Sequence, residues 1–486
     1  MHVSAESVWN RLPKASFCFL GWGIFGIWST LMYRFPPVEF PGFPSYANGS
    51  YEAMTAIVLV GIAAVARWRV GFAPLARHGW AIPLAVTLLF ACTCLSFGAA
   101  VFGLDSGALV VASLGFGGIG TALMMMLTSE FFGFIHPKRT VLYMAMGWLV
   151  ASPVTPFFRV LPLGYLWLVM CLIPVVIALC LWRAYRTLEG VIATPSLVVS
   201  GRFSFPWLPL VPIVLCAVTK GALMGLVPDG FDVEGANDAG TVFAALVVLG
   251  GLTIRGGDLN LRSLWQLGVA TMAGAVALFA LSVLMGAGQS VFGFASVALS
   301  TLSYDVLFIL MAAILANLSY RYGVCALWLF AIEHVAHLFA RNTGSLAVDV
   351  LLGVGDFSLV MIDGVFVVVA VVSMGAMAAL FARFSPDSLW GLSIREGDAA
   401  GETERLGFVS DDLAERFSLT TREGEILFLC LQGKRPSSIA EELLIEVSTV
   451  RTHIKRIYAK LGVHSKDELR ILAGLGKSPS EETVEE

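Results

Sequence analysis

The segment from Val447 to Leu461 holds the residues whose types and spacing point most directly to chemistry. Its apolar side chains recur as on one face of a helix: Val450, Ile454, Ile457 and Leu461. At about 100° per residue, the opposite face carries Ser448, Thr452, Lys455 and Ala459, flanked by Arg451 and Arg456. The segment has no carboxylate, and such a face suits the major groove of DNA, which is about 12 Å wide. The alternative is an amphipathic helix whose cationic side is merely solvated.

Three further short helices are expected around this segment. Thr420 followed by Glu423 is a capping box that opens the first of them. Pro436 suits the first turn of the second, and Ser465 with Glu468 opens the last. This run of motifs resembles the helix-turn-helix DNA-binding domain of the LuxR family of bacterial transcription regulators.

The resemblance implies roles for individual residues, with double-stranded DNA as the partner. In LuxR-type domains the third helix is the recognition helix, and the fourth commonly forms a dimer contact, which implies a homodimer on DNA. Transferred by position, the residues that approach base edges are Arg451, Thr452 and Lys455, on a face shared with Ser448 and Arg456. The expected phosphate contacts are Thr449, Lys434 and Arg435. One departure is Glu446, where the family usually has Ser or a similar cap.

The rest of the chain has the composition of a membrane protein. Of its 486 residues 57% are hydrophobic and 14% are charged, and its mean hydropathy is +0.81. A soluble domain carries roughly 25% charged residues, so a lipid bilayer must surround most of this chain. Runs long enough to cross a bilayer predict about twelve spans, at 15–33, 51–66, 79–101, 106–128, 139–158, 162–182, 206–227, 238–254, 263–286, 289–316, 323–340 and 357–382. The predicted fold is all-α, a polytopic membrane helical bundle followed by a four-helix DNA-binding domain.

Lys and Arg accumulate in one set of loops. With the amino terminus inside, fourteen of them lie in inner segments, whereas the outer segments hold three: Arg34, Arg159 and Arg341. Such an excess marks cytoplasmic loops, and it requires an even number of spans. The asymmetry predicts a multi-pass protein of the cell membrane with both termini in the cytoplasm.

The arrangement of spans resembles the major facilitator superfamily of transporters. Six spans lie on each side of the longest inner loop, which runs from Arg183 to Ser204. Members usually carry a loop of the form G-x-L-a-D-r-x-G-r-R between spans two and three. Here that loop reads Gly71-Phe72-Ala73-Pro74-Leu75-Ala76-Arg77-His78-Gly79. Ala76 stands where Asp is usual, which weakens the expectation of transport.

Ionisable residues deep in the later spans are candidates for a ligand pocket: Lys220, Asp305, Glu333, His337 and Asp363. Charges within a bilayer are costly and often functional. Glu333 and His337 share one helical face, and Lys220 could pair with Asp305 or Asp363. The alternative is that these groups form buried ion pairs and hydrogen bonds that fix helix packing. A metal site formed with His334 is less favoured than either.

The chain divides into four predicted parts. Residues 1–383 form the membrane domain, 384–415 a flexible acidic linker, 416–475 the DNA-binding domain and 476–486 an acidic tail. The apolar stretch Leu346–Gly353 is too short to span and is predicted to be re-entrant or part of a loop. The eight cysteines show no metal or disulfide spacing, and no cofactor is expected.

Together these features favour a membrane-bound one-component transcription regulator that senses an unknown small-molecule ligand through its membrane domain. The alternative is a major-facilitator-like secondary transporter with an appended DNA-binding regulatory domain. No hydrolase or transferase constellation is visible in the sequence, so an enzyme is not expected.

Overall fold

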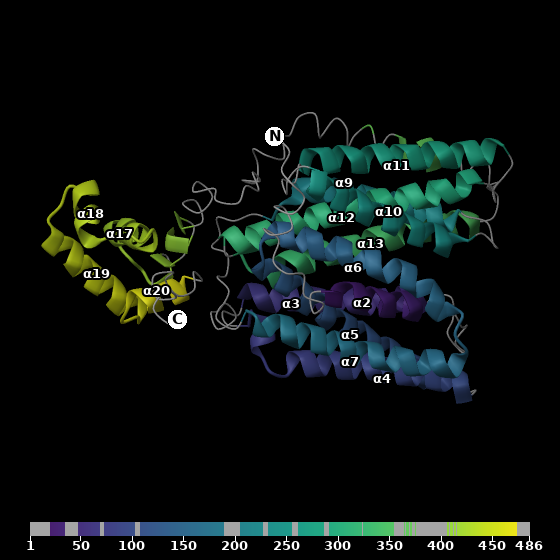
Figure 1. Cartoon of the computed structure of the whole chain (residues 1–486), viewed down its shortest axis with the longest axis horizontal. Coiled ribbons are helices and arrows are strands. Elements are labelled where there is room, and N and C mark those ends of the chain that lie inside the picture. Colours follow the sequence, from purple (N-terminus) through teal and green to yellow (C-terminus); the bar gives the residue numbers. More distant parts are fainter. Residues whose placement is uncertain are drawn as a thin grey trace.

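The computed structural model describes ten stretches of the chain and a few isolated positions. The stretches are residues 20–34, 47–68, 72–102, 107–188, 205–226, 232–254, 261–285, 291–322, 324–353 and 406–473 without 408, 412 and 415. The isolated positions are 364, 366–368, 370, 371 and 375. Within these residues the elements are helices, and they form a large bundle and a small carboxyl-terminal unit (Figure 1).

The first half of the bundle is built from six long helical elements. They are α2 (Gly21–Ser29), continued by a π-helical turn (Thr30–Arg34), α3 (Ala47–Trp68), α4 (Ala81–Phe102), α5 (Gly107–Phe134), α6 (Pro137–Arg159) and α7 (Leu163–Arg186). A short 3-10 turn, Leu75–Arg77, lies between α3 and α4.

The second half contributes five further long helices. They are α9 (Trp207–Gly225), α10 (Val233–Ile254), α11 (Leu261–Leu284), α12 (Val291–Tyr322) and α13 (Ala326–Gly353). The prediction of a loop or re-entrant segment at Leu346–Gly353 is wrong, because α13 continues through it as a regular helix. The twelfth predicted span, 357–382, lies mostly outside the described residues, although the described positions there are helical.

The lengths and compositions of these helices fit a bilayer. A helix of 22 residues, the length of α3 and α4, is about 33 Å long and exceeds the roughly 30 Å of hydrocarbon that it must cross. Eight of the described helices are long and apolar enough to span a membrane. The first eleven predicted spans each coincide with a described helix, which confirms the polytopic helical fold.

The two halves of the bundle pack against each other through α3, α5 and α6 on one side and α10, α12 and α13 on the other. In α12, 89% of the candidate span is buried, compared with 33% for α7 and for α11. α12 therefore lies in the interior of the bundle, while α7 and α11 lie at its periphery.

Glycine permits the closest helix crossings. A Cβ atom at Gly23 of α2 would overlap the backbone of Gly147 in α6, and one at Gly221 of α9 would overlap the carbonyl oxygen of Arg341 in α13. Small residues of this kind allow membrane helices to approach through their backbones.

The carboxyl-terminal unit has its own hydrophobic core. Its helices are α17 (Thr421–Leu431), α18 (Pro436–Glu442), α19 (Val447–Leu461) and α20 (Lys466–Leu472). The described residues from 406 to 416 are also helical, and Leu406, Val409 and Leu413 are buried in the same core. Packing in this unit therefore begins within the segment predicted as linker.

Local signals set the ends of these helices as expected. Thr420 accepts a hydrogen bond from the backbone N–H of Glu423, and Glu423 accepts one from the backbone N–H of Thr420, which completes the capping box. α19 ends at Gly462, whose φ of 69° is left-handed. The turn between α18 and α19 passes through Leu444, which has a φ of 51° without being glycine.

Candidate DNA-binding surface and membrane cavity

α19 has one buried and one exposed face. Val450, Ile457 and Leu461 are buried in the core of the carboxyl-terminal unit, and Ile454 is half-buried beside them. The predicted DNA-contacting residues on the opposite side are all exposed: Ser448, Thr449, Arg451, Thr452, Lys455 and Arg456. The heptad-like spacing of the apolar residues thus orients the polar face to solvent, where a duplex could reach it.

The long cations of this face are available for a ligand. Within the described part of the chain, Arg451, Lys455 and Arg456 have no hydrogen bond or ion pair. The hydroxyl of Thr452 donates to the carbonyl oxygen of Ser448 at 3.0 Å. This face can therefore offer free guanidinium and ammonium donors to bases or phosphates.

Lys460, the fourth cation of α19, contacts other parts of the carboxyl-terminal unit. Its ammonium donates to the Glu423 carboxylate at 2.7 Å and to the carbonyl oxygen of Ser418 at 3.2 Å, which ties the end of α19 to the start of α17. The hydrogen bonds from Lys460 and from the backbone N–H of Thr420 lower the pKa of Glu423 from its ordinary 4.5 to about 2. Three of the four cations of α19 remain for DNA.

The predicted phosphate contacts ahead of α18 differ from each other. Arg435, the residue before Pro436, is exposed. Lys434 is half-buried and forms an ion pair with Glu442, so a phosphate must compete with that carboxylate. Glu446 accepts a hydrogen bond from the Ser448 hydroxyl at 3.0 Å, which places its carboxylate at the amino end of the recognition helix.

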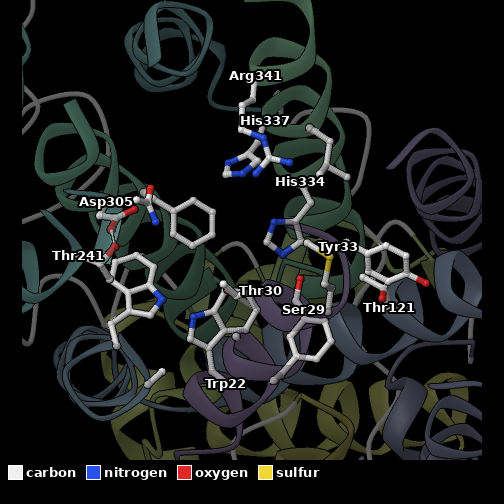
Figure 2. A pocket seen from close by; sticks show the side chains of 18 of the residues that line it. Trp22, Ser29, Thr30, Tyr33, Thr121, Thr241, Asp305, His334, His337 and Arg341 are labelled. Atoms are coloured by element: carbon white, nitrogen blue, oxygen red, sulfur yellow. Dashed lines mark hydrogen bonds between the residues drawn. The ribbon is translucent and has the colours of Figure 1, made fainter. Parts of the chain in front are cut away.

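The membrane bundle contains a cavity of about 130 Å³ between its two halves. Side chains from α2, α3, α5 and α6 line it on one side, and side chains from α10, α12 and α13 on the other. Figure 2 shows His334, His337 and Arg341 along α13, with Asp305 and Thr241 across from Tyr33 and Thr121. The volume is close to the roughly 150 Å³ of an engineered cavity that binds benzene.

Hydrogen bonds connect the polar groups of the cavity. His337 Nδ1 lies 2.6 Å from the Tyr304 hydroxyl, and Asp305 accepts a hydrogen bond from Thr241 at 2.7 Å. His334, which also lines the cavity, contacts the Ser129 hydroxyl at 2.9 Å through Nε2, and its Nδ1 lies 2.7 Å from a Glu333 carboxylate oxygen. This network joins α5 and α10 to the interior helices α12 and α13.

The five residues predicted for a ligand pocket have different places. Asp305 and His337 line the cavity. Glu333 contacts His334 and His337 behind the wall, and Lys220 lies over the face of the Tyr304 ring at 4.7 Å. Asp363 lies outside the described residues. Within those residues, no three His, Cys, Asp or Glu side chains form a group that could hold a metal ion.

Other cavity residues were not predicted. They are mainly aromatic, hydroxyl and charged residues: Trp22, Tyr33, Tyr51, Glu52, Thr121, Trp148, Thr241, Tyr304 and Arg341. Aromatic and hydroxyl residues are common in membrane helices, so only the fold distinguishes cavity positions from ordinary packing. Glu52 and Arg341 lie outside the apolar centres of their predicted spans, where a charge is not unusual.

Two groups of ion pairs join the halves of the bundle. Arg341 of α13 pairs with Glu52 of α3. Arg159 of α6 lies 2.8 Å from Glu234 and 3.4 Å from Asp238, both at the start of α10. The side chains of Arg341, Glu52, Arg159 and Asp238 are at most 16% exposed, so these contacts are largely shielded from solvent.

This architecture defines a class, a polytopic membrane protein that carries a helix-turn-helix DNA-binding domain. The sequence pattern of the GerE domain, "Bacterial regulatory proteins, luxR family", matches residues 417–473. The chain is 44% identical over 50 residues to the spore germination protein GerE of Bacillus subtilis (strain 168), covering 10% of this chain and 68% of GerE. The chain therefore belongs to the LuxR family of bacterial regulatory proteins.

A second relative is the transcriptional regulatory protein LiaR, also of Bacillus subtilis (strain 168). Identity is 39% over 79 residues, which cover 16% of this chain and 37% of LiaR. The chain thus spans about a third of this relative's length, and the similarity is confined to a segment of the size of the carboxyl-terminal unit.

Solved structures resemble the membrane bundle in fold. A bacterial homologue of the iron transporter ferroportin, in an outward-facing state with soaked iron, aligns over 78% of this chain and all of its own with a TM-score of 0.52 and 16% identity. The major facilitator superfamily proton:xylose symporter XylE aligns over 79% of this chain and 96% of its own, with a TM-score of 0.52 and 12% identity. The bundle therefore has the fold of a major facilitator transporter, as its layout predicted.

Proposed function

We propose that this protein is a one-component transcription regulator that binds DNA through α19 while its bundle remains in the membrane. The observation that carries the proposal is the union, in one chain, of a LuxR-family domain with free cations on its recognition helix and a membrane bundle with an internal cavity. In this scheme Arg451, Thr452 and Lys455 read base edges, with Ser448 and Arg456 beside them. Thr449, Arg435 and Lys434 hold phosphates.

The proposal requires the DNA-binding domain to face the cytoplasm. The excess of Lys and Arg in one set of loops supports this orientation, with both termini inside the cell membrane. DNA recognition as a homodimer is part of the proposal, and it rests on the habit of LuxR-type domains.

Signal detection is assigned to the cavity. A ligand that binds one arrangement of the two halves more tightly than another shifts the population of arrangements, and by no more than its differential affinity. The ion pairs Glu52–Arg341 and Arg159–Asp238 lie between the halves and would be remade or broken in such a shift. The change would reach DNA through the position or pairing of the carboxyl-terminal units.

Chromatin capture of the full-length protein, followed by sequencing, tests this proposal. We expect discrete enriched sites for the native protein and loss of enrichment for an Arg451→Ala, Lys455→Ala double variant at equal membrane content. Lys466→Ala is the matched control, because that cation lies on α20, is not among the predicted DNA contacts and donates to the carbonyl oxygen of Gly433 at 3.3 Å. Identical maps for the native protein and the double variant would contradict DNA recognition by α19.

A second candidate function is secondary transport reported through the DNA-binding domain. The observation that favours it is the fold, which the bundle shares with solved transporters. It predicts solute uptake that depends on Asp305 and persists in Lys455→Ala. Absence of uptake for any solute that changes operator occupancy would leave sensing as the function of the bundle.

A further inference from the structure

The charges at the cavity balance within the described part of the chain. Glu52, Asp238 and Asp305 line the cavity, and three cations lie in its wall or next to it: Arg341, Arg159 and Lys220. Arg341 pairs with Glu52, and Arg159 pairs with Asp238. Asp305 and Lys220 both have further partners. The described wall therefore has no excess charge for a charged ligand, and burying such a ligand without a counter-charge would be costly.

Most hydroxyl groups of the wall are already bound within the protein. Those with hydrogen-bond partners include Tyr51, Thr55, Thr121, Thr155, Thr241 and Tyr304. Among the described residues, the hydroxyl groups left for a ligand are those of Ser29, Thr30 and Ser152. Such a wall suits a ligand with one or two polar groups better than a polyhydroxylated ligand such as a sugar.

Aromatic rings form much of the remaining wall. Tyr33 stacks on Tyr51 with ring centroids 3.4 Å apart (Figure 2 shows Tyr33 and Trp22). The ring of Trp22 lies parallel to that of Phe308 at 6.2 Å, and the ring of Trp148 is tilted against Phe308 at 5.9 Å. Aromatic rings pair favourably in offset-stacked or edge-to-face arrangements, so a ligand ring between these side chains would gain such contacts.

We infer that the cavity binds a small uncharged aromatic compound with one or two polar groups, held mainly by the rings of Trp22, Trp148 and Phe308. This inference rests on the proposed sensing function and adds the chemical class of the ligand. The volume limits the ligand to roughly the size of a substituted benzene ring.

Three ring compounds of similar shape test the absence of charge, with the full-length protein in detergent. At pH 7 benzyl alcohol is neutral, benzylamine is a cation and benzoate is an anion. By isothermal titration calorimetry, with titrations into protein-free detergent subtracted, we expect benzyl alcohol to bind at least about tenfold more tightly than either ion. Equal or tighter binding of benzylamine or benzoate, or no binding of benzyl alcohol, would overturn the inference.

Phenol and cyclohexanol test the aromatic character of the ligand. Both are uncharged at pH 7 and carry one hydroxyl group on a six-membered ring. Phenol should bind about three- to tenfold more tightly, because only its ring can make aromatic contacts with the wall. Equal affinities, or tighter binding of cyclohexanol, would refute an aromatic ligand class.

Variants then locate the contact. Phe308→Leu should remove most of the preference for phenol over cyclohexanol, because the ring of Phe308 contacts those of Trp22 and Trp148 in the wall. Trp148→Leu provides a second, independent variant with the same expected result. Phe243→Leu is the matched control, because that exposed ring of α10 does not line the cavity. A preference that persists in both Phe308→Leu and Trp148→Leu would overturn the assignment.

A parallel measurement of operator DNA binding separates this inference from the proposed function. If benzyl alcohol binds with the expected preference but never alters DNA binding, the ligand class holds and sensing fails. If DNA binding responds to benzylamine or benzoate but not to benzyl alcohol, sensing holds and the ligand class fails.

Discussion

Arg451 and Lys455 are the two long cations expected to contribute most to operator binding. Each extends from the exposed face of α19 without a partner in the described part of the chain, so each can make a bidentate base contact or a phosphate contact. Replacing either with alanine should cost about 1–3 kcal/mol of operator binding and relax the preference at one base position, if it reads a base.

Residues that contact only the phosphate backbone of DNA should behave differently from residues that read bases. Arg435→Ala should weaken binding to all sequences alike and reduce the slope of affinity against salt by about one unit. Fluorescence anisotropy with sites recovered from cells, at several salt concentrations, measures both quantities. An unchanged affinity for Arg451→Ala and Lys455→Ala would exclude α19 as the reading helix.

Leu444 gives a prediction about stability. Its side chain is 91% exposed while its backbone is left-handed, a conformation that costs a non-glycine residue about 1–2 kcal/mol. Leu444→Gly should therefore raise the free energy of unfolding of the segment 405–486 by roughly 0.5–1 kcal/mol, after the entropic cost of glycine. Urea denaturation measures it, and Leu443→Gly, at a φ of −93°, should destabilise instead.

The orientation of single side chains is predictable where an apolar pattern sets it, whereas the role of a side chain is not predictable where its partners in the fold decide it. The apolar stripe of α19 indicated which side would be exposed, and the structure agrees. Lys460 carries the same charge as Lys455, but only the folded unit shows that Glu423 binds it. Cavity residues such as Tyr304 and Thr241 were not predicted, because their role depends on helices distant in sequence.

At the scale of elements, the capping box of α17 makes stability depend on pH. Because the pKa of Glu423 is lowered to about 2, its contribution is complete above its ordinary 4.5 and is lost as pH falls toward 2. Lys460 is 38% exposed, so solvent screening reduces this contribution to roughly 1–2 kcal/mol.

The corresponding test compares the segment 405–486 with its Glu423→Gln variant. The variant keeps an oxygen that can accept from the Thr420 N–H but loses the charge that holds Lys460. The difference in unfolding free energy between the two proteins should be largest at pH 7 and should shrink by pH 2. A difference that is independent of pH would contradict the role of the Glu423 charge.

The crossing of α2 and α6 depends on the absence of a side chain at Gly23. Gly23→Ala would place a Cβ atom against the backbone of Gly147 and should lower the thermal unfolding temperature in detergent, at a cost of about 1–3 kcal/mol. Gly26→Ala in the same helix is the control, because nothing lies within 4 Å of its added Cβ atom. Equal behaviour of the two variants would show that this crossing is not tightly packed.

Elements of the bundle were predictable because lipid imposes a minimum apolar length. That rule located eleven helices, and it failed for Leu346–Gly353, where an apolar run too short to span belongs to the longer α13. The same rule does not predict which side of α12 or α13 faces the cavity. The position of the cavity is therefore visible only once both halves of the bundle are packed together.

At the scale of the whole molecule, a transporter fold and a LuxR-family domain are joined in one chain. The central claim is that α19 binds duplex DNA on the cytoplasmic side while the bundle stays in the bilayer. Two observations support this claim. The bundle has helices long and apolar enough to cross lipid, and the carboxyl-terminal unit has its own hydrophobic core, as a domain in water requires.

The most direct measurement is the binding of labelled duplex DNA to membrane vesicles from cells that make the full-length protein. Inside-out vesicles should bind the DNA with an affinity that falls as salt rises, and the Arg451→Ala, Lys455→Ala variant should abolish this binding. Right-side-out vesicles should not bind it. DNA binding by right-side-out vesicles, or no salt-dependent binding by inside-out vesicles, would contradict the account.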